Sequence, residues 1–215
     1  MATHSNAERE RVAGVLAEKA FEDIATKYGQ LGHTPKEGHD ERHARASYRA
    51  GILIVEAAIE SGRIEPHYKS LVMIACANHD RVLDLVSGKN ERASAAIARA
   101  DMSEYSIFSF RDMGVVSRAI IGTTVQFQGL RMFQTPGADK ISKIVADADL
   151  ANLGSENDIF VKNSARMFAE THPDGHGAQE FINFQRVLLA EHEFYTPEAK
   201  ILFPNQTSNL MSLDY

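Results

Sequence analysis

The chain has 215 residues, of which 44% are hydrophobic and 24% charged, the composition of one soluble globular domain. No run of ~20 apolar residues predicts a membrane span, and the N-terminus lacks the apolar core of a signal peptide, so we expect a cytoplasmic protein. The single cysteine, Cys76, excludes a disulfide within this chain. The formal net charge of −6 gives no overall attraction to phosphate backbones, so we expect no stable complex with nucleic acid.

Apolar residues recur at helical spacing through most of the chain, as Val12, Leu16 and Ile24 do near its start. The sequence shows no sustained alternation of period two, the pattern typical of strands. The segment 51–55 also fits a buried strand, but its flanks are rich in helix formers. We therefore predict an all-α fold, a single compact helical domain. Its helices are expected at residues 6–28, 40–61, 66–86, 90–101, 113–128, 138–153, 157–171, 178–193 and 205–213.

Several histidines and aspartates lie within apolar sequence. His43 falls in the second predicted helix, His79-Asp80 near the end of the third, and Asp147 and Asp149 in the helix at 138–153. A buried charge is costly unless it is paired or bound to a metal. Imidazole and carboxylate together suit a divalent transition metal, so these residues are candidate ligands.

Each candidate also has a simpler interpretation. A single His-Asp dipeptide occurs often by chance, and Asp147 fits an ordinary solvated acid. Asp40 fits the N-cap of the second helix, since aspartate is favoured there. The pair His172 and His176 fits a solvated loop better than a metal site. The hypothesis of a metal centre therefore depends on the ordered set of residues on three separate helices.

That order, His43, then His79-Asp80, then Asp149, resembles the HD superfamily of metal-dependent phosphohydrolases. The flanking sequence extends the resemblance to one bacterial branch, the predicted metal-dependent HD phosphohydrolases. Residues 79–84 (HDRVLD) and 90–95 (NERASA) are similar to its pattern HD-x-V-Y-D followed by N-E-x-x-S-A, and residues 146–154 (ADADLANLG) to its D-x-D-L-x-x-L-G. The likeness spans residues 35–213, and residues 1–30 are interpreted as a variable N-terminal helix.

The resemblance implies an all-helical HD-type bundle over residues 1–215 that binds one divalent metal ion. The implied ligands are His43, His79, Asp80 and one aspartate of the pair Asp147 and Asp149. Both aspartates follow alanine, but only Asp149 precedes leucine as the superfamily ligand does, so we favour Asp149. The two lie ~200° apart around a helix, so both cannot point at the same ion.

The sequence also departs from the branch. The branch usually has the pattern T-x-x-H on the helix before the last aspartate, and here Gln126 stands at the position of that histidine. Leu83 stands at a position where the branch often has tyrosine. Glutamine is a poor transition-metal ligand, and no histidine lies between Asp80 and Asp147. We therefore expect one ion, drawn from Mn, Fe, Ni, Co, Zn or Mg, and we assign Gln126 to substrate binding.

An ion that lowers the pKa of a bound water supplies a nucleophile near neutral pH. Two acids are candidates for general acid–base catalysis: Glu91, in the family's N-E pair, and Asp84, one turn after Asp80. Glu91 also fits a helix cap, and Asp84 also fits a surface acid. Polar residues close in sequence to the ligands are candidates for substrate binding: Arg42, Arg81, Lys89, Asn90 and Gln126.

The expected function is hydrolysis of a small phosphorylated substrate, with a nucleotide as the substrate class that the resemblance implies. The alternative is a catalytically weak HD-fold module that binds a metal or a nucleotide. Dinuclear oxygenases of the superfamily need further histidines between Asp80 and Asp147, which this chain lacks. Homo-oligomerisation stays open, because the stretch 107–110 fits either the core or a dimer face.

Overall fold

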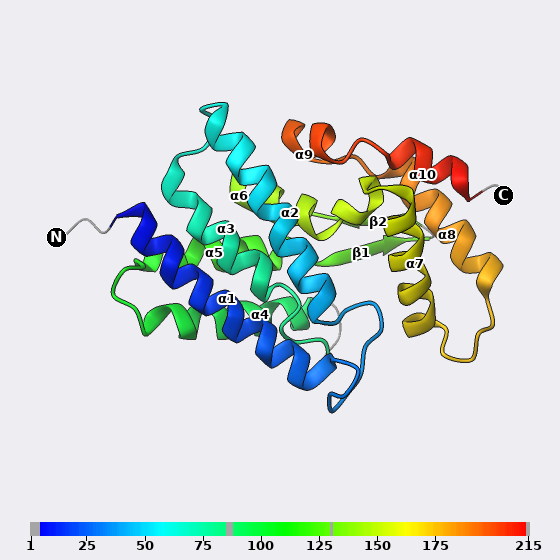
Figure 1. Cartoon of the computed structure of the whole chain (residues 1–215), viewed down its shortest axis with the longest axis horizontal. Coiled ribbons are helices and arrows are strands. Elements are labelled where there is room, and N and C mark those ends of the chain that lie inside the picture. Colours follow the sequence, from blue (N-terminus) through cyan, green and yellow to red (C-terminus); the bar gives the residue numbers. More distant parts are fainter. Residues whose placement is uncertain (1–4, 85–87, 130, 214–215) are drawn as a thin grey trace.

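The computed structural model describes residues 5–84, 88–129 and 131–213. It confirms the all-α prediction, since one short hairpin is the only sheet among these residues (Figure 1). In chain order the elements are α1 (Asn6–Tyr28), α2 (Glu41–Glu60), η1 (Pro66–Tyr68), α3 (Lys69–Asn78), α4 (Lys89–Ser103), α5 (Phe110–Ile121), β1 (Val125–Gln128), β2 (Arg131–Gln134), α6 (Lys140–Asp149), η2 (Ala151–Gly154), α7 (Asn157–Thr171), α8 (Ala178–Glu191), α9 (Pro197–Leu202) and α10 (Gln206–Ser212).

Helix α3 forms the centre of the larger part of the molecule. Its sequence is apolar or small on every face, so all residues from Ser70 to Asn78 are buried. Helices α1, α2, α5 and α6 pack around it. Gly51 of α2 allows a close approach to α3, because a Cβ there would lie 2.5 Å from the Sγ atom of Cys76. This packing brings the start of α2 and the end of α6 to the C-terminal end of α3.

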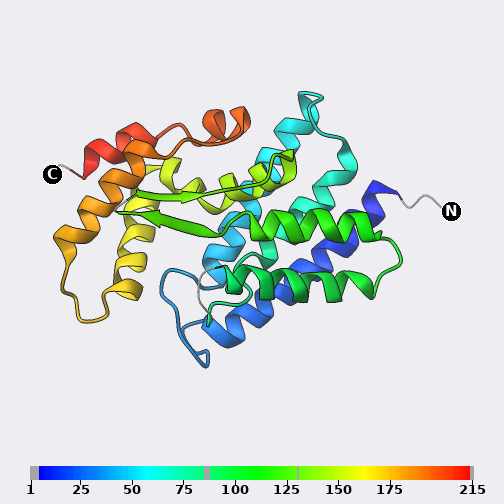
Figure 2. The same cartoon turned by 180° about the vertical axis from the view of Figure 1, so that it is seen from behind.

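The C-terminal elements form a smaller second cluster. Leu153, Phe160, Leu188 and Leu189 make its core, contributed by η2, α7 and α8. In Figures 1 and 2 these helices lie at the end of the molecule opposite the N-terminus, and the hairpin β1–β2 reaches toward them. No helix among the described residues is long and apolar enough to cross a bilayer.

The prediction of one helix over residues 113–128 was wrong. Helix α5 ends at Ile121, and β1 pairs with β2 in an antiparallel hairpin whose last pair is Gln128 with Arg131. Gly129, directly after β1, has a φ of 63°, which glycine adopts without steric cost. The β-branched run from Thr123 to Val125 favours a strand over a helix.

Other elements also differ from the prediction. The helix predicted over residues 138–153 is divided into α6, which ends at Asp149, and the short η2. Helix α3 ends at Asn78 instead of continuing toward residue 86, and residues 85–87 lie outside the described residues. Helix α9 was not predicted at all. Thr196 caps it by accepting from the N–H of Ala199, and Pro197 occupies its first turn, so the local signal for a helix start is present in the sequence. At the stretch 107–110, Ile107 and Phe108 are core residues.

A buried group of charges fixes the turn after α3. The Arg81 guanidinium donates to Asp101 of α4 at 2.5 Å, to Asp23 of α1 at 2.9 Å and to the side chain of Asn78 at 2.9 Å. The Arg81 side chain is 3% exposed. The backbone N–H of Leu83 donates to the Tyr28 hydroxyl at 2.7 Å. These bonds tie the turn that carries His79-Asp80 to two other helices.

We expect Asp101→Asn to lower the free energy of unfolding by about 2–4 kcal/mol, because it leaves the buried Arg81 charge poorly compensated. Urea unfolding at neutral pH measures this. Glu22→Gln, an exposed change on α1 beside Asp23, is the matched control and should stay within about 0.5 kcal/mol of the wild type. Equal effects of the two changes would show that the Arg81 network contributes little.

Candidate metal centre

The first candidate ligand, His43, is positioned by the cap of α2. Asp40 is the N-cap, and its Oδ1 atom accepts from the N–H groups of Arg42 at 2.9 Å and of His43 at 3.4 Å. The Asp40 carboxylate also accepts from the Arg166 side chain of α7 at 2.8 Å. The first turn of α2 is therefore held from both sides, and Asp40 acts as the cap that its position in the sequence predicted.

His79 and Asp80 follow α3 directly. The His79 side chain is 1% exposed, and its Nδ1 atom donates to the Cys76 carbonyl at 2.8 Å. That bond fixes the tautomer and leaves Nε2 facing the other candidate ligands, the arrangement common for metal-bound histidine.

The candidate ligands from three helices meet at one point. The Nε2 atom of His43 lies 3.2 Å from Nε2 of His79, and Asp149 Oδ1 lies 3.0 Å and 3.2 Å from these two atoms. Asp80 Oδ2 lies 3.4 Å from His43 Nε2 and 3.3 Å from His79 Nε2. All four ligand atoms lie within 4.8 Å of one another.

This group of four could hold a divalent ion. Separations near 3 Å match neighbouring ligands of an octahedral ion with bonds of about 2.1 Å. Two imidazoles and two carboxylates also suit a first-row transition metal. The same distances fit direct pairing between histidine and aspartate, so the geometry is compatible with a metal without requiring one.

The contacts within the cluster shift the pKa values of His79, Asp80 and Asp149. Burial raises the pKa of Asp80, but the charge and hydrogen bond of His79 outweigh it and lower the pKa to about 2. The pKa of Asp149 is lowered in the same way by His79 and His43. Burial lowers the pKa of His79, and the two carboxylates raise it well above its usual value. The carboxylates are therefore ionised at neutral pH, as ligands must be.

Asp147, the other aspartate of the pair, lies outside the cluster. It is fully buried, so it is not a solvated acid. Its carboxylate accepts from the N–H of Tyr195 at 2.7 Å, from the N–H of Thr196 at 2.8 Å and from the Thr196 hydroxyl at 2.6 Å. Burial raises its pKa to about 6, although these three bonds lower it. Asp147 therefore anchors the segment before α9, and Asp149 is the aspartate in the cluster.

Sequence reasoning missed the residue that holds Asp149. The Gln134 amide at the end of β2 donates to Asp149 Oδ2 at 2.6 Å and to the Thr123 carbonyl at 3.1 Å. The Tyr195 hydroxyl donates to the Gln134 carbonyl at 2.6 Å. Gln126, the residue predicted to bind substrate, is exposed on β1 and donates to Thr135 at 3.0 Å. Gln126 lies on a strand, whereas the sequence was interpreted as a helix there.

A second missed contact lies beside His43. The ring of His39 is edge-on to the ring of His43, with the centroids 5.6 Å apart. Glu170 of α7 accepts from His39 Nδ1 at 2.8 Å. Its other oxygen accepts from the N–H groups of Gly38 at 2.7 Å and of His39 at 2.9 Å. Burial raises the pKa of Glu170, but the His39 contacts and these N–H groups lower it to about 2. Nothing in the local sequence signals this pair, because 131 residues separate its members.

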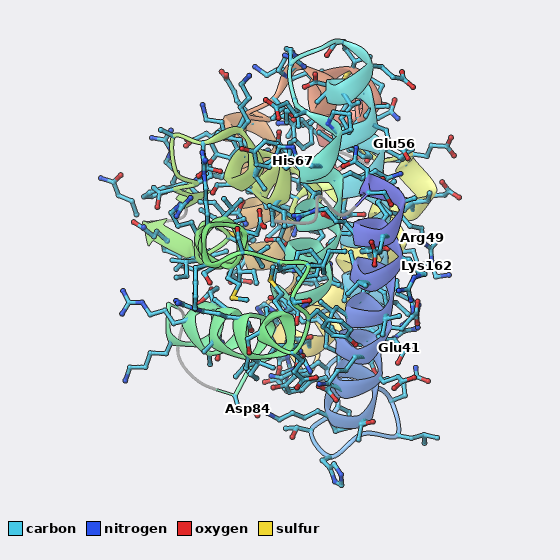
Figure 3. The ribbon with its side chains drawn as sticks, turned by 90° about the vertical axis from the view of Figure 1, so that its left-hand side faces the viewer. Glu41, Arg49, Glu56, His67, Asp84 and Lys162 are labelled. Carbon is cyan, nitrogen blue, oxygen red and sulfur yellow. The ribbon has the colours of Figure 1, made fainter. Side chains whose placement is uncertain are left out.

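The two residues proposed for acid–base catalysis have other contacts. Glu91 accepts from the N–H of Gly88 at 2.6 Å, as a capping residue of α4 does. Asp84 is partly exposed and forms an ion pair with Lys27 of α1, and Figure 3 shows it at the surface of the molecule. Among the described contacts, neither carboxylate reaches the cluster.

The remaining proposed substrate-binding residues divide into two groups. Arg42 and Arg81 are engaged in the structure itself, Arg42 with Asp40 at 2.6 Å and Arg81 in the buried network described above. Lys89 is exposed and Asn90 half-buried in the first turn of α4. The histidines His172 and His176 lie in the connection between α7 and α8, as expected for a loop.

No protein-family model matches this chain, and no curated protein matches it. The functional interpretation therefore depends on the cluster and its surroundings.

We expect the protein to bind one Mn²⁺ per chain, and we expect Asp80→Asn and Asp149→Asn to weaken that binding at least about a hundredfold. Asp147→Asn is the matched control on the same helix and should retain one ion per chain, because Asp147 lies outside the cluster. Equilibrium dialysis with elemental analysis measures both. Undiminished binding in Asp149→Asn, or two tightly bound ions in the wild type, would contradict this assignment.

The lowered pKa of Glu170 predicts a dependence of stability on pH. A carboxyl group with a pKa of about 2 when folded and about 4.5 when unfolded stabilises the fold above pH ~4.5, and this contribution is lost as pH falls toward 2. We expect Glu170→Gln to cost about 2–3 kcal/mol at pH 6 and less than half of that at pH 3, measured by urea unfolding. The exposed Glu180→Gln should show no such trend. A cost independent of pH would refute the linkage.

Proposed function

We propose that this protein is a metal-dependent phosphohydrolase that acts on a small phosphorylated substrate. The observation that carries the proposal is the meeting of His43, His79, Asp80 and Asp149 at one point. Their order along the chain resembles that of the HD superfamily. This resemblance is read from the sequence alone and does not depend on the geometry. A nucleotide is the proposed substrate class, and that part rests on the resemblance alone.

The four candidate ligands differ in how far their side chains are exposed to solvent. His79 is buried, whereas the side chains of His43, Asp80 and Asp149 are 14–20% exposed, so solvent and substrate reach the cluster from their side. A divalent ion held by the four residues would supply a Lewis acid and a water of lowered pKa. Gln134 fixes the orientation of Asp149, and the Cys76 carbonyl fixes that of His79, so both would meet the ion in a set geometry.

The alternative is a binding module of the same fold with little turnover. One observation favours it: the contacts of Glu91 and Asp84 are those of a cap and a surface ion pair, not of catalytic groups. A binding module would hold a metal or a nucleotide without releasing phosphate. Turnover therefore separates the two functions.

The test is phosphate release by the Mn²⁺-loaded protein from a panel of nucleoside mono-, di- and triphosphates and simple phosphate esters. We expect release from at least one of them. Asp80→Asn, which keeps the shape of the side chain, should lose metal and activity together, as should His79→Ala. Binding without release across the panel would favour the binding module, and full activity in either variant would refute the metal centre.

Glu91→Gln completes the same experiment. The glutamine carbonyl can still accept from the Gly88 N–H, so the cap is retained and only the acid–base capacity is removed. If Glu91 is the general acid or base, turnover falls roughly a hundredfold while the metal stays bound. Wild-type turnover would restrict Glu91 to its capping role.

A further inference from the structure

A second group of charged side chains lies at the end of α6 opposite the cluster. A cavity of about 160 Å³ opens where α2, α6 and α9 pack against one another (Figure 1). Its lining includes Arg63 after α2, Lys140 and Lys143 at the start of α6, and Glu198 of α9. Lys140 and Asp149 are nine residues apart on α6, which is about 13 Å along the helix axis, so the cavity is separate from the cluster.

The lining of this cavity is positively charged. Three cations and one carboxylate give it a formal charge of +2, whereas the whole chain carries −6. Lys140 and Lys143 are three residues apart, so they share one face of α6, where like charges repel. A cleft lined by charges of one sign attracts ions of the other sign. The cavity therefore favours an anion.

The single carboxylate of the lining offsets only one of the three cations. Glu198, whose side chain is 7% exposed, pairs with Nη2 of Arg63 and accepts from the Ser61 hydroxyl at 3.4 Å. Lys140 Nζ donates to the Arg63 carbonyl at 2.6 Å, a bond that fixes its position but leaves its charge without an acid. Lys143 is half-buried and forms no ion pair with the residues that the structure describes.

Two other acids near these helix ends are engaged elsewhere. Asp139 is the N-cap of α6, and its carboxylate accepts from the N–H of Ser142 at 2.9 Å and from the Ser142 hydroxyl at 2.7 Å. Asp147 accepts the three bonds from Tyr195 and Thr196 described above. Neither aspartate is a lining residue of the cavity, so neither takes the place of a bound anion.

The size of the cavity limits what it can hold. One water takes about 30 Å³ in the liquid, so the cavity has room for about five waters. Pockets for drug-sized molecules usually measure about 300 Å³ or more. The cavity therefore suits a small ion with some of its water and is too small for a whole nucleotide.

We propose that this cavity binds a small oxyanion with two negative charges, of the class of inorganic phosphate. The ammonium groups of Lys140 and Lys143 and the Arg63 guanidinium supply its hydrogen-bond donors. The bound anion offsets the charge of the lining and links the turn after α2 to the start of α6. This inference does not rest on the proposed function, because the cavity and the cluster share no residue.

The test is calorimetric titration of the full chain with inorganic phosphate, at a pH where phosphate carries two charges and at constant ionic strength. EDTA is present, so that no divalent ion draws phosphate to the cluster. We expect one phosphate per chain, with a Kd of about 1 mM or lower. Acetate, with a single charge, should bind at least about tenfold more weakly.

Three substitutions locate the binding site. Lys143→Gln removes one cation, and we expect it to weaken phosphate binding about tenfold, the scale of a lost hydrogen bond to a charged group. Glu198→Gln removes the carboxylate of the lining and should strengthen phosphate binding severalfold. Lys162→Gln, at an exposed position on α7 that Figure 3 labels, is the matched control for net charge and should bind phosphate as the wild type does.

Stability gives a second measurement of the same binding. An anion that binds only the folded state stabilises it, so phosphate should raise the urea midpoint of the wild type more than that of Lys143→Gln. Absence of phosphate binding by the wild type would overturn the proposal. Equal losses in Lys143→Gln and Lys162→Gln would overturn it too, because they would show a response to net charge alone. The proposed function is tested separately, by metal binding and turnover.

Discussion

The buried contact of His79 with side chains from two other helices is the constraint on which the site depends. His79 lies at the end of the apolar helix α3, so its imidazole enters the core, where an unpaired polar group would be costly. His43 from α2 and Asp149 from α6 meet it there at 3.2 Å each. The packing of α2 and α6 on α3 and the polar contacts of the cluster therefore determine the same geometry.

A second layer of contacts holds these ligands in place, and most of it comes from the C-terminal half of the chain. Gln134 fixes Asp149, and Tyr195 fixes Gln134. On the other side, Arg166 and Glu170 of α7 bind the turn that begins α2. Helix α7 contributes one fully buried residue, Phe160, to the smaller core. The main contacts between α7 and the turn that begins α2 are thus polar. A change in the position of α7 would therefore affect the cluster through Arg166 and Glu170.

The sequence revealed the parts of the molecule that depend on local pattern. The helix at residues 6–28 was predicted with its observed bounds, because its apolar residues share one face. The candidate cluster was predicted from the order of its residues and its resemblance to a known family, and the structure brings Asp149, the preferred aspartate, into that group. Pairings between distant residues left no local signal. Arg81 was interpreted as a substrate contact because it follows His79-Asp80 in the sequence. Its observed partners, Asp23 and Asp101, lie 58 and 20 residues away. The pair His39 and Glu170 was missed for the same reason. The hairpin that carries Gln134 did have local signals, in Gly129 and in the β-branched residues from Thr123 to Val125, but the helical pattern was preferred there.

Diffraction at the manganese edge from crystals grown with Mn²⁺ tests the metal centre most directly, because it locates the ion without assuming a function. We expect one strong anomalous peak per chain, about 2.1–2.3 Å from the Nε2 atoms of His43 and His79 and from oxygens of Asp80 and Asp149. The absence of a peak there, with the four side chains paired only with one another, would contradict the metal centre. A peak elsewhere, such as between His172 and His176, would contradict it equally.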